Sequence, residues 1–133
     1  MRAMPLESHN KALMTISDEH EHLSQLLDAL SHVLKQDPID PTAVTAALND
    51  ILEDTIEHFA HEEELMLETG YTQYDNHQKS HEYILGLIKN HIALHQAGKL
   101  NMESDTPTVM ERAMLIHFEK FDQELVILVT EKL

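Results

Sequence analysis

Histidine is the residue type through which this sequence can most clearly do chemistry. The chain of 133 residues contains eleven histidines and no cysteine. Imidazole nitrogens bind transition metals, so histidines that share a helix face with a carboxylate are candidate metal ligands. The absence of cysteine excludes disulfides, thiolate zinc sites and iron–sulfur clusters.

Five of these histidines lie on the apolar faces of segments with helical periodicity. Residues three, four or seven positions apart share a helix face, so His20 lies on the face of Leu23. A carboxylate joins the set, because Glu62 follows His58 by four residues. Unpaired polar groups of this number in a small core would together cost on the order of several kcal/mol, which one metal site removes. The candidate ligands from spacing are His20, His58, Glu62, His77, His81 and His117.

Four amphipathic segments are predicted to position these side chains. Apolar residues recur at helical spacing over residues 18–36 and 41–68, in a third segment that ends near Gly98, and from Thr106 to about Glu131. Three glycines, four prolines and 5% aromatic residues favour helices over strands. We therefore predict an all-α protein, an antiparallel up-down four-helix bundle. Residues 1–133 would form one domain, with an N-terminal arm over 1–17 and the bundle over 18–131.

Local signals predict where the helices begin and end. Asp40 and Pro41 are typical of an N-cap followed by proline at the first helical position. Gly70 is predicted to end the second helix, and Thr72 with Asp75 resembles a capping box for the third. In an up-down bundle the start of one helix neighbours the end of the next, so His20, His58, Glu62, His77 and His81 are expected to gather toward one end. His117 is expected near the middle of the fourth helix, roughly 15 Å from its start.

Charge and hydropathy limit the partners. The formal net charge is −15, which repels nucleic acid and anionic membranes. No apolar run approaches the length of a membrane span, and the first twenty residues contain no secretory apolar region. The expected compartment is the cytoplasm, with no nucleic-acid or membrane partner.

Four motifs in series resemble the hemerythrins, in particular the bacterial single-domain type. They are Asp18-Glu19-His20-Glu21-His22-Leu23, the run from His58 to Met66, His77 to His81, and His117 to Asp122. The resemblance adds Asp122, which lies five residues after His117 and about 140° around an α-helix. It implies that His77, His81 and His117 bind one iron and that His20 and His58 bind a second. Glu62 and Asp122 would bridge the two irons together with an oxo or hydroxo group.

The same resemblance implies reversible dioxygen binding. Counting ligands gives six at the first iron and five at the second, which leaves one open position for dioxygen or another small ligand. Storage, transfer or sensing of oxygen would follow. A diiron enzyme acting on peroxide or nitric oxide shares these ligands and stays an alternative, as does an iron buffer or store. No catalytic residue is assigned.

Four residues are expected near the bound ligand, and three depart from the family pattern. Phe59 keeps the family type, whereas Ala113 and Met114 replace the usual tryptophan and leucine, and Phe118 replaces an isoleucine. Either Phe118 and Met114 refill the volume, or the pocket over the open position is wider.

The other polar residues near the motifs receive structural interpretations. His22 and His61 are expected to be exposed, and Glu63 and Glu64 to form a solvated face. His95 lies eighteen residues after His77 and so about 27 Å along the helix, too far to join the same site.

Overall fold

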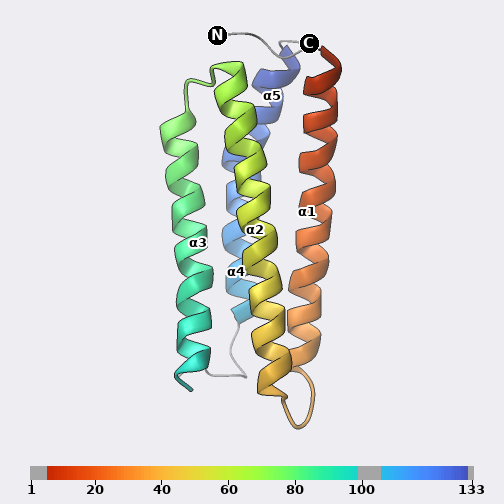
Figure 1. The fold of residues 1–133 in the computed structure, drawn as a ribbon, viewed down its shortest axis with the longest axis vertical. Coiled ribbons are helices and arrows are strands. Elements are labelled where there is room, and N and C mark those ends of the chain that lie inside the picture. Colours follow the sequence, from red (N-terminus) through yellow and green to blue (C-terminus); the bar gives the residue numbers. More distant parts are fainter. Residues whose placement is uncertain (1–5, 99–105, 132–133) are drawn as a thin grey trace.

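The structure, a computed structural model, describes residues 6–98 and 106–131, and in that part of the chain every element is helical. Three helices are continuous: α1 (Leu6–Leu34), α2 (Pro41–Thr69) and α3 (Tyr74–Gln96). A fourth rod consists of α4 (Thr106–His117), η1 (Phe118–Asp122) and α5 (Gln123–Glu131). The rods alternate in direction, so the start of α1, the α2–α3 connection and the end of α5 lie at one end (Figure 1). The prediction of an all-α up-down bundle is confirmed.

The ends of α2 follow the predicted local chemistry. The Asp40 carboxylate accepts a hydrogen bond from the Thr42 N–H at 3.0 Å, and Pro41 is the first helical residue. Gly70 ends the helix in the left-handed region, at a φ of 65°, where a side chain would be strained. The capping box predicted for the third helix is wrong, because α3 begins at Tyr74 and its N-cap, Gln73, makes no side-chain capping bond.

The first helix begins earlier than predicted. Residues 6–17, which we expected to form an arm, are the first turns of α1. Ile16 explains part of the difference, since its side chain is buried against Leu65, Met66 and Leu125 at the end of the bundle where α1 begins. One buried apolar residue gives too little periodicity to detect. Residues 1–5 lie outside the described part of the chain.

The core is divided into two apolar clusters by a polar layer. On α1 the polar layer contributes His20, between Ile16 and Leu23, and on α2 it contributes Glu62, between Phe59 and Leu65. On α3 and on the fourth rod, too, the residues of the polar layer lie between residues of the two apolar clusters. The larger cluster contains Leu23, Leu27, Leu30, Val44, Leu48, Ile51, Phe59, Ile84, Ile88, Ile92, Met110 and Met114, and the smaller one Ile16, Leu65, Met66, Tyr71, Leu125 and Val129. The chemistry-bearing side chains therefore lie inside the bundle with apolar packing above and below.

The fourth rod contains one extra residue in its inward pattern. The Gln123 N–H donates to the Phe118 carbonyl, five residues back, as in a π-helix. Its buried residues are Met110, Met114, His117, Asp122, Leu125 and Val129, at spacings of 4, 3, 5, 3 and 4. Phe118, Phe121 and Leu128, which continuous α-helical periodicity places inward, are only partly buried. No described helix has both the length and the apolar character that crossing a membrane requires.

Candidate metal centre

The structure brings all seven predicted ligand residues together in the polar layer. His58, Glu62 and His77 are fully buried, and three more are 1% exposed. These residues form two groups whose ligand atoms lie within 4.8 Å of one another. The first group is Glu62, His77, His81, His117 and Asp122, and the second is His20, His58, Glu62 and Asp122.

One oxygen of each carboxylate faces the three-histidine group. Glu62 Oε1 lies 2.9 Å from His81 Nε2 and 3.1 Å from His77 Nε2. Asp122 Oδ1 lies 2.8 Å from the Nε2 atoms of both His77 and His117. Three imidazole nitrogens and two carboxylate oxygens thus converge on one point.

The other oxygen of each carboxylate faces the two-histidine group. Glu62 Oε2 lies 3.0 Å from His58 Nε2, and Asp122 Oδ2 lies 2.8 Å from His20 Nε2. Each carboxylate therefore presents its two oxygens to two different sets of imidazoles, which is the arrangement that a pair of bridged metal ions requires.

The π-helical turn explains how Asp122 reaches this layer. On a continuous α-helix, a residue five positions after His117 would be turned about 140° away. A hydrogen-bond ring that closes over five residues places both on nearly the same face. The sequence gives no local sign of this turn, and only the resemblance had pointed to Asp122.

Several buried atoms of this layer fit a metal ion better than they fit each other. Within the described residues, four buried atoms of the layer form no hydrogen bond: His58 Nε2, Glu62 Oε2, His117 Nε2 and Asp122 Oδ1. Each of the two nitrogens nevertheless lies within 4 Å of a carboxylate oxygen of the layer. Buried polar atoms are rarely left without a partner. Lone pairs that converge without mutual hydrogen bonds are satisfied when a cation lies between them.

Comparison with known proteins identifies the family. The family described as hemerythrin HHE cation binding domain matches residues 12–126. The chain belongs to the hemerythrin family. A bacteriohemerythrin of Stenotrophomonas maltophilia is 29% identical over 114 residues, which cover 86% of this chain and 72% of the relative. Bacteriohemerythrins of Pseudomonas paraeruginosa and Pseudomonas aeruginosa are each 23% identical, over 85% of this chain and 72% of theirs. No solved structure matches with significant similarity.

Three residues that the sequence pattern does not assign contact the outer nitrogens of three of these imidazoles. His58 Nδ1 lies 3.2 Å from Glu19 Oε1, His81 Nδ1 lies 3.1 Å from Glu63 Oε2, and His117 Nδ1 lies 2.7 Å from Ser80 Oγ. A proton held at Nδ1 by an oxygen leaves the Nε2 lone pair free for metal. The expectation that Glu63 belongs to a solvated face is therefore wrong. The signal was available, because a metal-binding histidine needs such a partner and Glu63 adjoins Glu62.

Aromatic rings hold two of the histidines from the side. Phe118 stacks on His20 and Phe59 stacks on His81, each with 3.8 Å between ring centroids. Met114 is buried in the larger apolar cluster. Ala113 instead lines a groove between α3 and α4, together with His117. Of the four residues expected near the bound ligand, Phe118 lies against the two-histidine group, whereas Ala113 lies on the three-histidine side.

The two-histidine group is the more accessible one. The side chain of His20 is 25% exposed, whereas the other four histidines are at most 1% exposed. A cavity of about 380 Å³ opens beside it, lined by Ile16, Phe118, Asp122 and Val126 among others. A small molecule can therefore approach the polar layer next to His20.

The carboxylates control the charge of the imidazoles. Burial lowers the pKa of His58, but Asp122 and Glu62 outweigh burial and raise that pKa to about 10. The same balance raises the pKa of His77 to about 9, while burial lowers the pKa of His81. Burial alone would raise the pKa values of Glu62 and Asp122, but the imidazoles, His117 first, hold both well below the usual range. Without metal, the layer holds protons that a cation would displace.

Three further histidines of the described residues have partners outside this layer. His22 pairs with Asp54 at 2.7 Å and its side chain is 57% exposed, as expected. His61 is 40% exposed and its Nδ1 lies 2.8 Å from Glu19 Oε2. His95 Nε2 lies 3.1 Å from the carbonyl of Pro41 and 2.9 Å from Thr45 Oγ1, so it ties α3 to the start of α2. None of these three belongs to either candidate metal group among the described residues.

Proposed function

We propose that this hemerythrin-family protein holds two iron ions and binds dioxygen reversibly. The three-histidine group would bind one iron and the two-histidine group the other. Glu62 and Asp122 would bridge them, as their paired oxygen contacts support. When bound, two ferrous ions supply the electrons that reversible dioxygen binding needs.

The observation that carries this proposal is the asymmetry of the two groups. With one solvent-derived bridge, the three-histidine group supplies six ligands and the two-histidine group five, and an octahedral preference leaves a single position open. The cavity beside His20 reaches the two-histidine group. The cavity therefore borders the group that would keep the open position, which supports the proposal.

The protein's own residues would select the ligand. Phe118, Ile16 and Val126 form apolar walls of the cavity, and Glu119 and Asp122 also line it. Such a lining admits a small neutral molecule more readily than a hydrated anion. Five imidazoles and only two carboxylates form the layer. Imidazole-rich ligation favours reversible binding, whereas the carboxylate-rich sites of ferritin-like proteins use paired Glu-x-x-His motifs. This chain has one such motif, Glu19 to His22.

Metal analysis and the visible spectrum test the proposal together. Protein expressed in iron-rich medium should contain two irons per chain. Chemically reduced protein should gain a visible band in air and lose that band when oxygen is removed. One iron per chain, or preferred zinc, would reject the dinuclear site. Consumption of added peroxide or nitric oxide in place of a reversible band would favour an enzyme, and release of more than two irons per chain would favour a store.

A further inference from the structure

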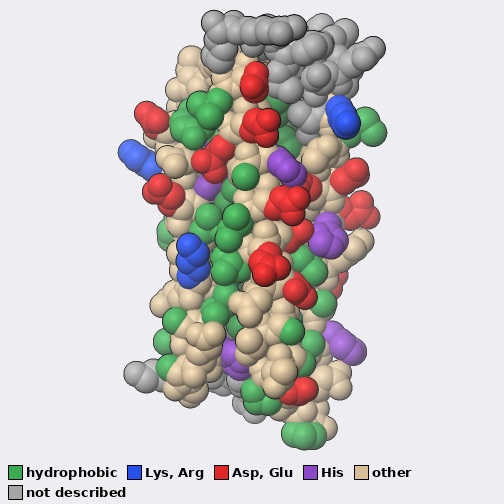
Figure 2. Space-filling view, in the orientation of Figure 1, with side chains coloured by type: hydrophobic (Ala, Val, Ile, Leu, Met, Phe, Trp, Pro, Cys, Tyr) green, Lys and Arg blue, Asp and Glu red, His purple; other side chains and the backbone are tan. Residues whose placement is uncertain are grey.

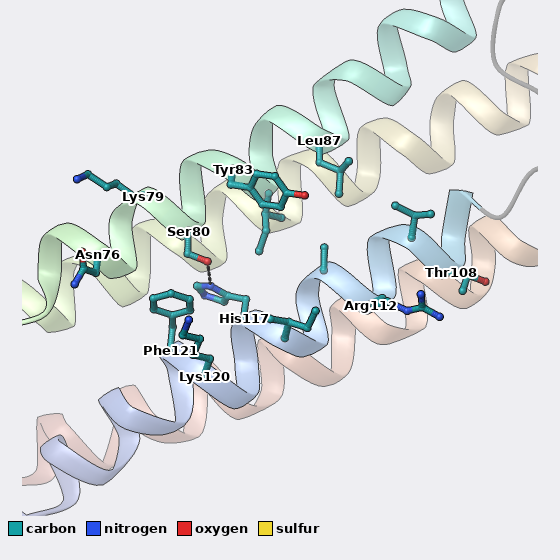
Figure 3. A pocket seen from close by; sticks show the side chains of 14 residues that line it. Asn76, Lys79, Ser80, Tyr83, Leu87, Thr108, Arg112, His117, Lys120 and Phe121 are labelled. Carbon is teal, nitrogen blue, oxygen red and sulfur yellow. Dashed lines mark hydrogen bonds between the residues drawn. The ribbon is translucent and has the colours of Figure 1, made fainter.

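The groove between α3 and α4 has the size of a small-molecule site. Its volume is about 670 Å³, within the roughly 300–1,000 Å³ range of ligand pockets. Figure 3 shows Tyr83 and Ser80 on the α3 wall and His117 and Phe121 on the opposite wall. The groove is distinct from the cavity at His20, with which it shares no lining residue among those described.

Positive charge gathers at this groove in a strongly acidic protein. Lys79, Arg112 and Lys120 line it, although the whole chain has nine Lys and Arg against 24 Asp and Glu. Lys79 and Lys120 lie toward the end marked by Asn76, and Arg112 lies toward the other end (Figure 3). By contrast, carboxylates predominate among the charged side chains on the face shown in Figure 2. No described lining residue is acidic.

These cations have no carboxylate partner within the described residues. Lys79 and Arg112 form no hydrogen bond or ion pair there, and the Lys120 ammonium lies 5.4 Å from the centroid of the Phe121 ring. A cation near a ring, and a guanidinium without a carboxylate partner among the described residues, both suit a flat π-system that carries negative charge. Tyr83, whose residue surface is 67% exposed, adds a second aromatic ring.

We propose that this groove binds a small planar aromatic anion. The aromatic body would pack against Tyr83, Phe121 and the apolar wall around Ile116, and its acidic group would pair with Arg112 or the two lysines. A small molecule is favoured over a protein partner, because the cations line a concave groove and the acidic surface of this chain as a whole repels acidic macromolecules. The binding claim does not depend on iron or on the proposed oxygen binding.

Calorimetric titration of the full-length protein, as purified, with 2-naphthoate tests the charge requirement. Neutral 2-naphthalenemethanol, which has the same ring system, should bind at least about tenfold more weakly, as should aliphatic decanoate. The double variant Lys79→Gln/Arg112→Gln removes a cation from each end of the groove, so it should weaken naphthoate binding by about tenfold whichever end the carboxylate occupies. Lys89→Gln, on an exposed part of α3 away from the groove, should bind as the wild type does.

A second variant tests the location. Ala113→Trp places an indole in the groove beside His117 and should weaken naphthoate binding by at least about tenfold while circular dichroism shows an unchanged helix content. Equal affinity for the neutral compound, or unchanged binding in the double variant, would overturn the proposal even if Ala113→Trp did not fold. Sedimentation in which the wild type dimerises and the Lys79→Gln/Arg112→Gln variant does not would also overturn the proposal, because a second copy of the chain would then occupy the groove.

Discussion

At the scale of single residues, the chemistry depends on which nitrogen of each imidazole faces the polar layer. Glu19, Glu63 and Ser80 bind the outer Nδ1 atoms of His58, His81 and His117. The inner Nε2 atoms are thereby left to face Glu62 and Asp122. These outer partners come from α1, α2 and α3, so the orientation of each ligand depends on the packing of its neighbouring helix.

Removal of one ligand should distinguish the two metal groups. His58→Ala takes one of only two imidazoles from its group, so the variant should keep about one metal ion per chain at the three-histidine group. His91→Ala is the matched control, because the Nδ1 of His91 contacts the Leu87 carbonyl and His91 belongs to neither group. Metal analysis after dialysis gives the answer. Loss of metal in the control would contradict the assignment.

The outer partners should matter although they are not expected to touch metal. Glu63→Ala removes the oxygen at His81 Nδ1, and metal affinity should fall by about 10–100-fold, as for other second-sphere partners. Glu64→Ala changes the next residue, which is exposed, and should have little effect. Competition with a chelator measures both affinities. Equal affinities in the two variants would show that Glu63 does not orient His81.

The route of small ligands should follow the cavity at His20. Val126→Phe narrows that cavity and should slow azide binding to the oxidised, iron-loaded protein by about tenfold or more. Ala113→Trp places an indole in the groove on the three-histidine side and should leave the rate unchanged. Stopped-flow absorbance follows both. A slower rate only in Ala113→Trp would place the entry in the α3–α4 groove instead.

At the scale of elements, the sequence predicted the four rods but not the turn that completes the site. Asp40, Pro41 and Gly70 act within their own segments, so their effects can be inferred locally. The π-helical turn at Phe118–Asp122 cannot be inferred in this way. A regular 3.6-residue period turns Phe118 and Phe121 inward and Asp122 outward, which is the reverse of what the site needs. Tertiary contacts decide it: with the extra residue, His117, Asp122 and Leu125 all face the core.

Changing the length of this turn tests that account. Deletion of the exposed Glu119 restores spacings of 4, 3, 4, 3 and 4, so Asp122 should still face the layer from a regular α-helix. An alanine inserted after Glu119 should turn the aspartate away and reduce binding to about one metal or none. Metal analysis with circular dichroism compares the variants. A folded deletion variant without metal would show that the π-helical turn itself sets the reach of Asp122.

At the scale of the whole molecule, two apolar clusters enclose the charged layer, and pairing between its imidazoles and carboxylates offsets the cost of burying it. Leu23 and Phe59 pack on one side and Leu65 and Leu125 on the other, which keeps water from most of the ligands. The histidine positions on the four helices could be predicted from sequence, because periodicity fixes both face and height. The partners Glu19 and Ser80 could not, since they depend on how neighbouring helices are rotated.

Metal and protons compete for this layer, so the stabilisation by metal should grow with pH. The pKa values of His58 and His77, raised to about 10 and about 9, exceed the ordinary value of 6.5. In the metal-free protein their ion pairs contribute stability that is fully present below pH 6.5 and is lost as the pH rises through 9–10. The lowered pKa values of Glu62 and Asp122 affect stability only in the acidic range, so the contribution of these two carboxylates does not change over this interval.

A bound metal replaces those protons, and its affinity rises as they leave. The increase in Tm that cobalt(II) produces under anaerobic conditions should therefore be larger at pH 8.5 than at pH 6.5. His22→Ala is the control, because His22 is exposed and pairs with Asp54 outside the layer, so the same difference should persist. Thermal unfolding followed by circular dichroism measures each Tm. A cobalt effect that is equal at both pH values, or larger at pH 6.5, would mean that His58 and His77 do not exchange protons for metal.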